Sequence, residues 1–242
     1  MKKNNFLPKA ARMVTFGAAM IAVVASSTIL TGCKKDSAPE PTPAAAEPTA
    51  AVNFKNNLSS TGTSGGFYWQ CYFTSGSATL TNGSAGNFAV SYNNVGDVVA
   101  GKGYSTGSNG TRGYNVGALS GSYNFVGIYG WTTSPLIEYY VCELGSVVAG
   151  SQVNTVSSDG HTYSFYKHQQ VSQPSIQGTA TFWQYLDNWG GSSTGSNHTI
   201  TMANHISNWQ SHGGQGFGSY NYQILALEAY NNKSGYINAT VW

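Results

Sequence analysis

Charged side chains are scarce in this chain. Of its 242 residues, 9 are acidic and 11 are basic, so that only 8% carry charge. Four of the basic residues lie at the very start of the chain: Lys2, Lys3, Lys9 and Arg12. Without these four the balance becomes 7 basic against 9 acidic residues, the net charge changes from +2 to −2, and no basic run remains. The rest of the chain therefore lacks the positive surface that binds nucleic acid.

Cysteine is also rare, with three residues at Cys33, Cys71 and Cys142. Cys33 lies in an N-terminal motif described below, which leaves two cysteines for the remainder of the chain. In an exported protein these two could form one disulfide. The alternative is two buried free thiols in different strands.

The N-terminus has the pattern of a secretory signal. Its basic residues precede an apolar stretch from Met13 to Leu30, which ends in Leu30-Thr31-Gly32-Cys33. These last four residues resemble a bacterial lipobox, in which the cysteine is lipidated and becomes the mature N-terminus. We therefore expect a lipoprotein signal peptide over residues 1–32 and lipidation at Cys33. A membrane-spanning helix is the alternative, but the stretch is short and is interrupted by polar residues at 26–28.

Residues 33–52 contain no aromatic side chain and are rich in Ala, Pro, Glu and Thr. Such a segment cannot build a core, so we expect a semi-extended tether. Residues 53–242 follow without a second linker and predict one domain.

Glycine, serine, threonine, asparagine and aromatic residues dominate this domain, which is typical of secreted all-β proteins. Short alternating aromatic runs between turn signals predict a sandwich or barrel. Met202, Ile206 and Trp209, followed by two glycines, predict one short helix packed on the back of a sheet. The expected strands are Phe67–Phe73, Asn87–Tyr92, Phe125–Trp131, Leu136–Glu143, Thr162–His168, Thr179–Leu186, Tyr220–Tyr230 and Tyr236–Trp242.

Local signals remove three of the six carboxylates in residues 53–242 from consideration. Asp159 precedes a glycine in a hairpin-turn signal. Asp187 follows a strand, and we expect it in a loop. Glu143 points to the strand face opposite Glu138, because side chains alternate along a strand.

Three carboxylates remain as site candidates: Glu138, Glu228 and Asp97. The two glutamates lie inside apolar, aromatic strand runs, where a charge is costly without a partner or a proton. Each shares a strand face with a tyrosine, which can donate a hydrogen bond to a carboxylate. Two carboxylates are the minimum set for cleaving a glycosidic bond. The alternative is that each glutamate is a structural, hydrogen-bonded carboxylate.

Other chemistries have weaker support. Gly103-Tyr104-Ser105-Thr106-Gly107 matches the G-x-S-x-G pattern, but it lies in a Gly/Ser-rich β region and not at a strand-to-helix elbow. The five histidines show no metal-ligand spacing, and we expect them at surface or helix-face positions. We expect neither a metal nor a cofactor at the site.

A series of segments now carries a more specific signal, in chain order: Gly101-Lys102-Gly103, Tyr129-Gly130-Trp131, Pro135-Leu136-Ile137-Glu138-Tyr139-Tyr140, Pro174-Ser175-Ile176-Gln177-Gly178, Gln184-Tyr185, Ala203-Asn204-His205 and Asn221-Tyr222-Gln223-Ile224-Leu225-Ala226-Leu227-Glu228-Ala229-Tyr230. Together they resemble the family 11 glycoside hydrolases, the endo-β-1,4-xylanases. The resemblance implies an all-β fold: a β-jelly-roll sandwich of two curved antiparallel sheets, with a long cleft and a single short helix. It also separates the strands of Cys71 and Cys142 in the sheet, which favours free thiols.

The resemblance further implies a retaining, double-displacement mechanism, with Glu138 as the nucleophile and Glu228 as the acid/base. Their carboxyl groups should then lie about 5–5.5 Å apart. Glu228 should have the higher pKa, because Glu138 is already charged nearby. Asp97 falls beside the acid/base, where an Asp accompanies an acidic pH optimum in the family. The implied supporting residues are Asp97, Tyr129, Tyr140, Gln184 and Tyr222.

Residues with an implied role in substrate binding are Phe73, Trp131, Pro174, Ser175, Ile176 and Phe182, of which the segment from Pro174 resembles the tip of a thumb hairpin over the cleft. Three positions depart from the family pattern. Phe73 and Leu186 stand where we align tryptophans, and Gln170 stands where an arginine is usual. The two aromatic changes reduce the area for stacking on sugars, and the third removes a positive charge that would help keep the nucleophile ionised.

We therefore expect an endo-acting hydrolase of β-1,4-xylan or a related plant-wall polysaccharide. It should be a monomer, anchored in the cell envelope through the lipid on Cys33, with its catalytic domain outside the cell. The alternatives are a non-catalytic glycan-binding lipoprotein on the same fold and a β-1,4 or mixed-linkage glucanase.

Overall fold

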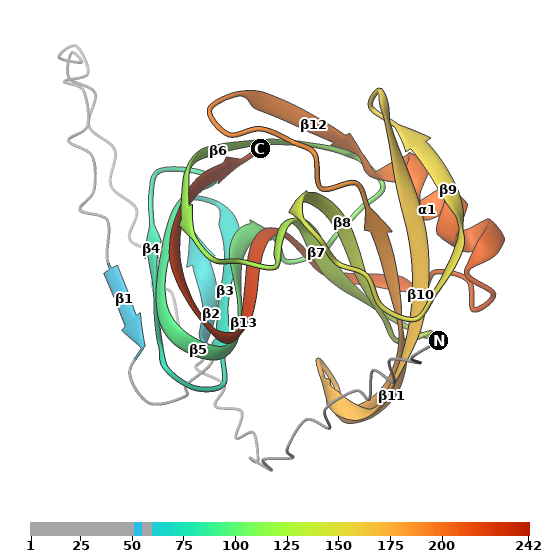
Figure 1. The fold of residues 1–242 in the computed structure, drawn as a ribbon, viewed down its shortest axis with the longest axis horizontal. Coiled ribbons are helices and arrows are strands. Elements are labelled where there is room, and N and C mark those ends of the chain that lie inside the picture. The colour runs from blue at the N-terminus through green and yellow to red at the C-terminus, as the bar shows by residue number, and fades with distance from the viewer. Residues whose placement is uncertain (1–50, 55–59) are drawn as a thin grey trace, which may run out of the picture. The chain divides into compact units, whose positions relative to one another are not determined.

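The computed structural model describes residues 51–54 and 60–242 (Figure 1). The expected signal peptide, the lipidation site at Cys33 and nearly all of the expected tether lie outside these residues. Strand β1 (Ala51–Phe54) pairs with β4 (Ser77–Asn82), so strand pairing begins just before the expected domain boundary at residue 53. Within the described ranges, no helix is long and apolar enough to cross a lipid bilayer.

Strands make up most of the described chain, and one helix interrupts them. The helix is α1 (Met202–His212). The other strands are β2 (Ser60–Ser64), β3 (Phe67–Phe73), β5 (Asn87–Tyr104), β6 (Thr111–Gly121), β7 (Phe125–Thr133), β8 (Ile137–Gly145), β9 (Ser151–Ser158), β10 (His161–Ser175), β11 (Gly178–Asn188), β12 (Asn197–Thr201) and β13 (Ser219–Val241).

The strands form two layers that are joined by the long strands β5 and β13 (Figure 1). The first half of β5 pairs with β4, and its second half pairs with β3. Strand β13 pairs with β7 in its first half and with β6 in its second half. Because both strands pass from one layer into the other, hydrogen bonding is continuous across a 13-stranded sheet. The predicted curved sandwich is confirmed, with one correction: β8 and β11 pair in parallel.

Side chains alternate between two buried clusters on the two faces of the layer that contains β8. Ile137, Tyr139 and Val141 belong to the core between the layers. Tyr140 and Cys142 belong to a second cluster on the other face, here called the cleft-face cluster. The alternation predicted for this strand is confirmed, and it places Glu138 on the same face as Tyr140.

Helix α1 covers the interlayer core with the residues that its periodicity predicts. Met202, Ile206 and Trp209 are buried, and Gly213 ends the helix. The ring of Trp209 lies 5.5 Å from that of Tyr139 in β8, measured between centroids. The helix therefore packs on the face of β8 that is turned away from Glu138.

The two described cysteines are free and buried. Cys71 lies in the interlayer core, whereas Cys142 lies in the cleft-face cluster. Their strands, β3 and β8, are not neighbours in the sheet, which confirms the expectation of free thiols.

Candidate active site

Glu138 lies on β8, which pairs with β7 on one side and β11 on the other, and it is only 7% exposed. Gln184 stands directly beside it in the register with β11 and donates from Nε2 to Glu138 Oε2 over 2.7 Å. The Tyr129 hydroxyl donates to Oε1 over 2.7 Å. Tyr140 is a third hydrogen-bond partner. The structure thus brings Glu138 together with three of its expected supporting residues.

Tyr129 is itself held by a second donor. The indole Nε1 of Trp131 donates to the Tyr129 oxygen over 2.8 Å, so the tyrosine proton is directed to Glu138. The Tyr129 ring meets that of Tyr140 edge-on, with 5.0 Å between the centroids. These contacts fix the hydroxyl in a position from which it can stabilise a charged carboxylate.

Two opposing effects set the pKa of Glu138. Burial raises this pKa above its usual value, because a charged carboxylate loses its hydration there. The hydrogen bonds from Gln184, Tyr129 and Tyr140 lower it, because they favour the ionised form. An ionised Glu138 at working pH therefore depends on these donors.

Glu228 on β13 and Asp97 on β5 lie on adjacent strands, where Glu228 pairs with Val99 and Asp97 with Tyr230. Both side chains are half-buried. Burial raises the pKa of Glu228 well above its usual value, and the negative charges of Asp97 and Glu138 raise it further. The pKa of Asp97 is also raised, first by burial and then by the charge of Glu138. The three carboxylates therefore share one electrostatic neighbourhood, in which burial and both neighbours disfavour the charged form of Glu228.

Tyr222 joins this group from β13. Its hydroxyl is hydrogen-bonded with Gln70 and Tyr129, and its ring stacks on Tyr68 at 5.4 Å. Gln70 and Tyr68 come from β3 and were missed in the sequence. Their alternation with the buried residues of that strand was the signal that could have found them.

One expected substrate-binding residue lies elsewhere. Phe73 is 2% exposed and belongs to the interlayer core, together with Trp69 and Cys71. Because side chains alternate along β3, the even-numbered residues Tyr68 and Tyr72 pack on the cleft-face cluster instead. The expected role of Phe73 in substrate binding was therefore wrong.

Trp131 and Phe182 lie in the cleft-face cluster, but they are largely covered by other side chains. Their rings meet edge-on at 4.8 Å. Leu186, at a position where we aligned a tryptophan, is buried in the same cluster. These three residues are therefore packed inside this cluster and present almost no surface.

The expected thumb is the turn between β10 and β11. Pro174 is exposed there, and Ile176 packs against the cleft-face cluster. The Ser175 hydroxyl donates to the Gly178 carbonyl over 2.7 Å and accepts from the Gln177 amide over 3.0 Å. These bonds close the tip of the hairpin.

The opposite face of β8 carries a second buried glutamate. Glu143 accepts hydrogen bonds from the hydroxyls of Tyr114, over 2.6 Å, and Tyr163, over 2.7 Å. As expected from strand parity, its side chain lies on the face of β8 opposite Glu138, which is the face that packs on the interlayer core. Both carboxylate oxygens therefore have a tyrosine donor.

Asp187 was expected in a loop, and this was wrong. It lies within β11, is fully buried and contacts His205 Nδ1 over 2.6 Å. His205 lies on α1, one of the two kinds of position expected for the histidines, and is equally buried there. A carboxylate can remain inside this core because its partner is buried with it.

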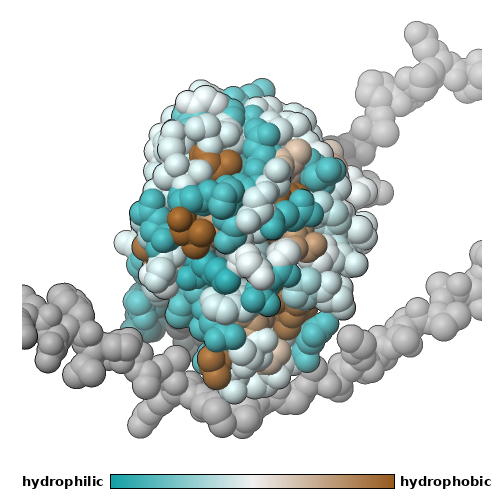
Figure 2. All heavy atoms as spheres, turned by 90° about the vertical axis from the view of Figure 1, so that its right-hand side faces the viewer, coloured by the Kyte–Doolittle hydropathy of each residue, from teal (hydrophilic) through white to brown (hydrophobic). Residues whose placement is uncertain are grey.

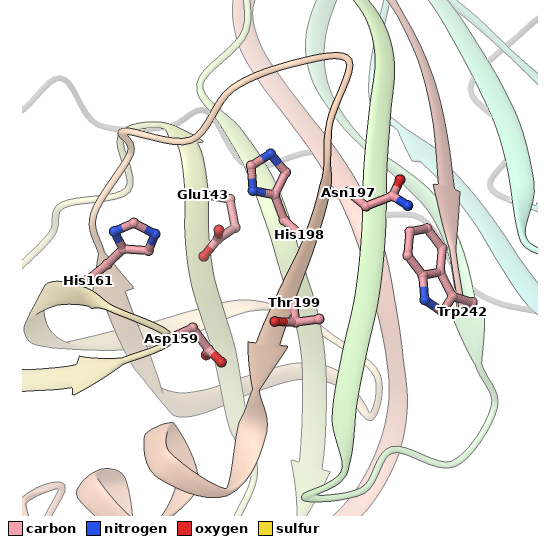
Figure 3. Close-up of a pocket in the computed structure, with 7 residues that line it drawn as sticks. All are labelled: Glu143, Asp159, His161, Asn197, His198, Thr199 and Trp242. Atoms are coloured by element: carbon pink, nitrogen blue, oxygen red, sulfur yellow. The ribbon is translucent and has the colours of Figure 1, made fainter.

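A hollow of about 270 Å³ opens on the Glu143 side and not at the catalytic candidates (Figure 3). Figure 3 shows Glu143 and Asp159 on one side of it and Trp242 on the other. Asp159 lies in the expected turn, with φ of 53°, and accepts hydrogen bonds from the amide and hydroxyl of Thr201. Both carboxylates that line this hollow accept hydrogen bonds from other protein groups.

Comparison with known proteins places this fold and site in a family. Residues 64–240 match the family model described as "Glycosyl hydrolases family 11". The chain belongs to glycosyl hydrolase family 11. Family 11 relatives include an ethylene-inducing xylanase of Penicillium digitatum and endo-1,4-beta-xylanase 2 of Rhizopus oryzae. Each is 44% identical over 191 residues, which cover 74% of this chain and 84% of the relative.

A solved xylanase structure has a similar fold. One of two major endo-1,4-beta-xylanases from Trichoderma reesei is 36% identical, with a TM-score of 0.64. The match covers 72% of this chain and 97% of that chain. The family 11 domain therefore accounts for most of the described residues.

Proposed function

We propose that this chain is an endo-β-1,4-xylanase that cleaves within the xylan chain with retention of anomeric configuration. The observation that carries the proposal is that two neighbouring carboxyl groups have different environments. Glu138 has hydrogen-bond donors on both oxygens, which favour its charge. The pKa of Glu228 is raised by burial and by the charges of Asp97 and Glu138. Retaining glycosidases need one carboxylate of each kind.

In the first step, Glu138 attacks the anomeric carbon and the glycosidic carbon–oxygen bond breaks. Glu228 gives its proton to the departing oxygen, so that the leaving sugar departs as a neutral alcohol. In the second step, Glu228 takes a proton from water. The resulting oxygen attacks the glycosyl ester, and Glu138 is released as a carboxylate.

Support for xylan as the substrate comes from the relatives, which are named as xylanases and endo-1,4-beta-xylanases. The test is the release of reducing sugars by the full chain on xylan, mixed-linkage glucan and a soluble cellulose derivative. We expect release from xylan. Release from the glucans alone would show that the substrate is a glucan and not xylan. Binding to xylan without release would favour a glycan-binding protein.

Two variants test the assigned roles. Glu138→Gln should abolish turnover, because an amide cannot form the glycosyl ester. Glu228→Gln should lose most activity on xylan but retain the first step on an aryl xylobioside with a good leaving group, which needs no proton. Equal loss on both substrates would contradict the acid role of Glu228.

We also propose that the protein is exported and anchored through a lipid on Cys33, with its catalytic domain outside the cell. The support is the sequence of basic, apolar and Leu30-Thr31-Gly32-Cys33 segments. Incorporation of radiolabelled palmitate in a bacterial host tests the proposal. Label in the wild type that is absent from Cys33→Ser is expected, and equal label in both would overturn it.

A further inference from the structure

Gln170 on β10 reaches toward the site from outside the residues identified above. It pairs with Phe182 on β11, immediately before the irregularity in the register between Gln170 and Gln173. Its side chain extends diagonally across the hairpin, and Nε2 donates to Gln184 Oε1 over 3.2 Å. The half-buried Gln170 thus contacts a residue that touches Glu138.

The two oxygens of Glu138 are approached in the same way. On one side, Trp131 donates to Tyr129, and Tyr129 donates to Oε1. On the other side, Gln170 donates to Gln184, and Gln184 donates to Oε2. Two of the three partners of the carboxylate, Tyr129 and Gln184, are therefore each oriented by a second donor.

We propose that Gln170 is a positioning residue for the nucleophile: its amide holds the amide of Gln184 with the nitrogen toward Glu138. The proposal rests on the proposed function, because it takes Glu138 as the nucleophile. Gln170 itself does not contact the carboxylate in this arrangement.

The physical reason lies in the two orientations of a glutamine amide. With Gln170 donating to its oxygen, Gln184 presents an N–H to Glu138, which favours the ionised carboxylate. If the amide turned over, its nitrogen would face the Gln170 donor and its oxygen would face the carboxylate, and both contacts would be unfavourable. A chain of two donors also polarises the intervening amide and strengthens its bond to the charge.

Other groups that influence the ionisation of Glu138 must stay constant in the test. They come from β5, β7, β8 and β13: Asp97, Tyr129, Tyr140, Tyr222 and Glu228. On β10, Tyr166 packs against the cleft-face cluster and His168 stands opposite Gln184 in the register, so variants at Gln170 must leave both in place.

The experiment is a carboxyl ¹³C NMR titration of the full chain, labelled at the glutamate δ-carbon. The chain has five glutamates, and Glu138→Gln identifies the signal that belongs to Glu138. Gln170→Leu removes the donor and should raise the titration midpoint of Glu138 by about 0.5–1 pH unit, the size expected for one neutral hydrogen bond. Gln170→Glu should raise it further, whereas Gln170→Arg retains a donor and should leave it unchanged or lower.

Gln169→Leu is the matched control. Gln169 is the preceding residue on β10, is exposed and pairs with Trp183, so its replacement should leave the midpoint where it is in the wild type. The acid limb of kcat/KM on an aryl xylobioside should move with the NMR midpoint. If Gln170→Leu left the midpoint unchanged, or if Gln169→Leu moved it equally, the proposal would be overturned.

The NMR readout separates this proposal from the proposed function. A wild type without hydrolytic activity, but with a Glu138 midpoint that follows the order Arg, Gln, Leu, Glu at position 170, would overturn the enzymatic function and retain the positioning role. Should Gln170→Leu fail to fold, Gln170→Met also lacks an amide donor and adds no charge, so it tests the same upward shift.

Discussion

Tyr129→Phe removes one hydrogen-bond donor from the candidate nucleophile, together with the contacts of the same hydroxyl with Trp131 and Tyr222. The substitution keeps a ring that is 4% exposed and removes only its hydroxyl. It deletes the 2.7 Å bond to Glu138 Oε1 and leaves the Trp131 indole N–H without its acceptor. Gln184 and Tyr140 remain as partners of the carboxylate.

A hydrogen bond to a charged group contributes about 1.5–3 kcal/mol. Since one pKa unit corresponds to about 1.36 kcal/mol, its loss should raise the pKa of Glu138 by about 1–2 units. The acid limb of kcat/KM should move upward by the same amount. The unpaired indole N–H should cost about a further 1–3 kcal/mol in the free energy of unfolding.

The stability cost should depend on pH. The hydroxyl favours the ionised form of Glu138, so the variant has the higher folded-state pKa. The lost stabilisation is therefore fully expressed above that pKa and disappears as pH falls and Glu138 becomes protonated in both proteins. Denaturant unfolding at neutral and acidic pH measures this difference.

Tyr114→Phe is the control for this prediction. Its hydroxyl donates to Glu143 Oε2 over 2.6 Å on the opposite face of β8, so it should lower stability without moving the acid limb. The reasoning would be refuted if Tyr129→Phe reduced kcat equally at all pH values, or if Tyr114→Phe moved the limb as far.

Two further predictions concern the other buried carboxylates. Asp97→Asn removes a negative charge that raises the pKa of Glu228, so the pKa of Glu228 should fall and the pH profile of activity should move; an unmoved profile would show that Asp97 does not set it. Asp187→Ala leaves the buried His205 without its carboxylate and should lower the free energy of unfolding by about 3–5 kcal/mol, measured with denaturant; a loss below about 1 kcal/mol would mean that the pair contributes little.

Strand parity predicted much of the site because it depends only on local geometry. It assigned Glu138 and Glu143 to opposite faces of β8 and predicted the face that Glu138 shares with Tyr140. Phe73 was misassigned because its role came from a residue-by-residue resemblance, whereas the parity of β3 turns it into the core. The helix could also be predicted, because its apolar residues recur at helical spacing.

Features that depend on distant partners could not be predicted. Asp187 looked like a loop residue because it follows the end of an expected strand. Its buried partner, His205, lies further along the chain on α1 and could not be foreseen from the local sequence. Strand β13 was expected as two strands because a polar segment interrupts its apolar pattern. Instead, Asn231 and Asn232 take positive φ values of 64° and 61°, and the strand continues through an irregular register. Such a bulge is a property of the paired sheet, and the apolar pattern alone does not reveal it.

Strand β8 offers an internal comparison of what makes a carboxylate catalytic. Glu138 and Glu143 are both buried, and both accept hydrogen bonds from two tyrosines. Tyrosine donors alone therefore do not distinguish a nucleophile from a structural residue. The difference lies in the charged neighbours. Glu138 has Asp97 and Glu228 near it, whose pKa values its charge raises. Burial raises the pKa of Glu143, while the hydrogen bonds from its two tyrosines and the charges of His205 and His161 lower it. In the proposed mechanism, the like charges around Glu138 help Glu228 to keep its proton beside an ionised nucleophile, as hydrolysis of a glycoside requires.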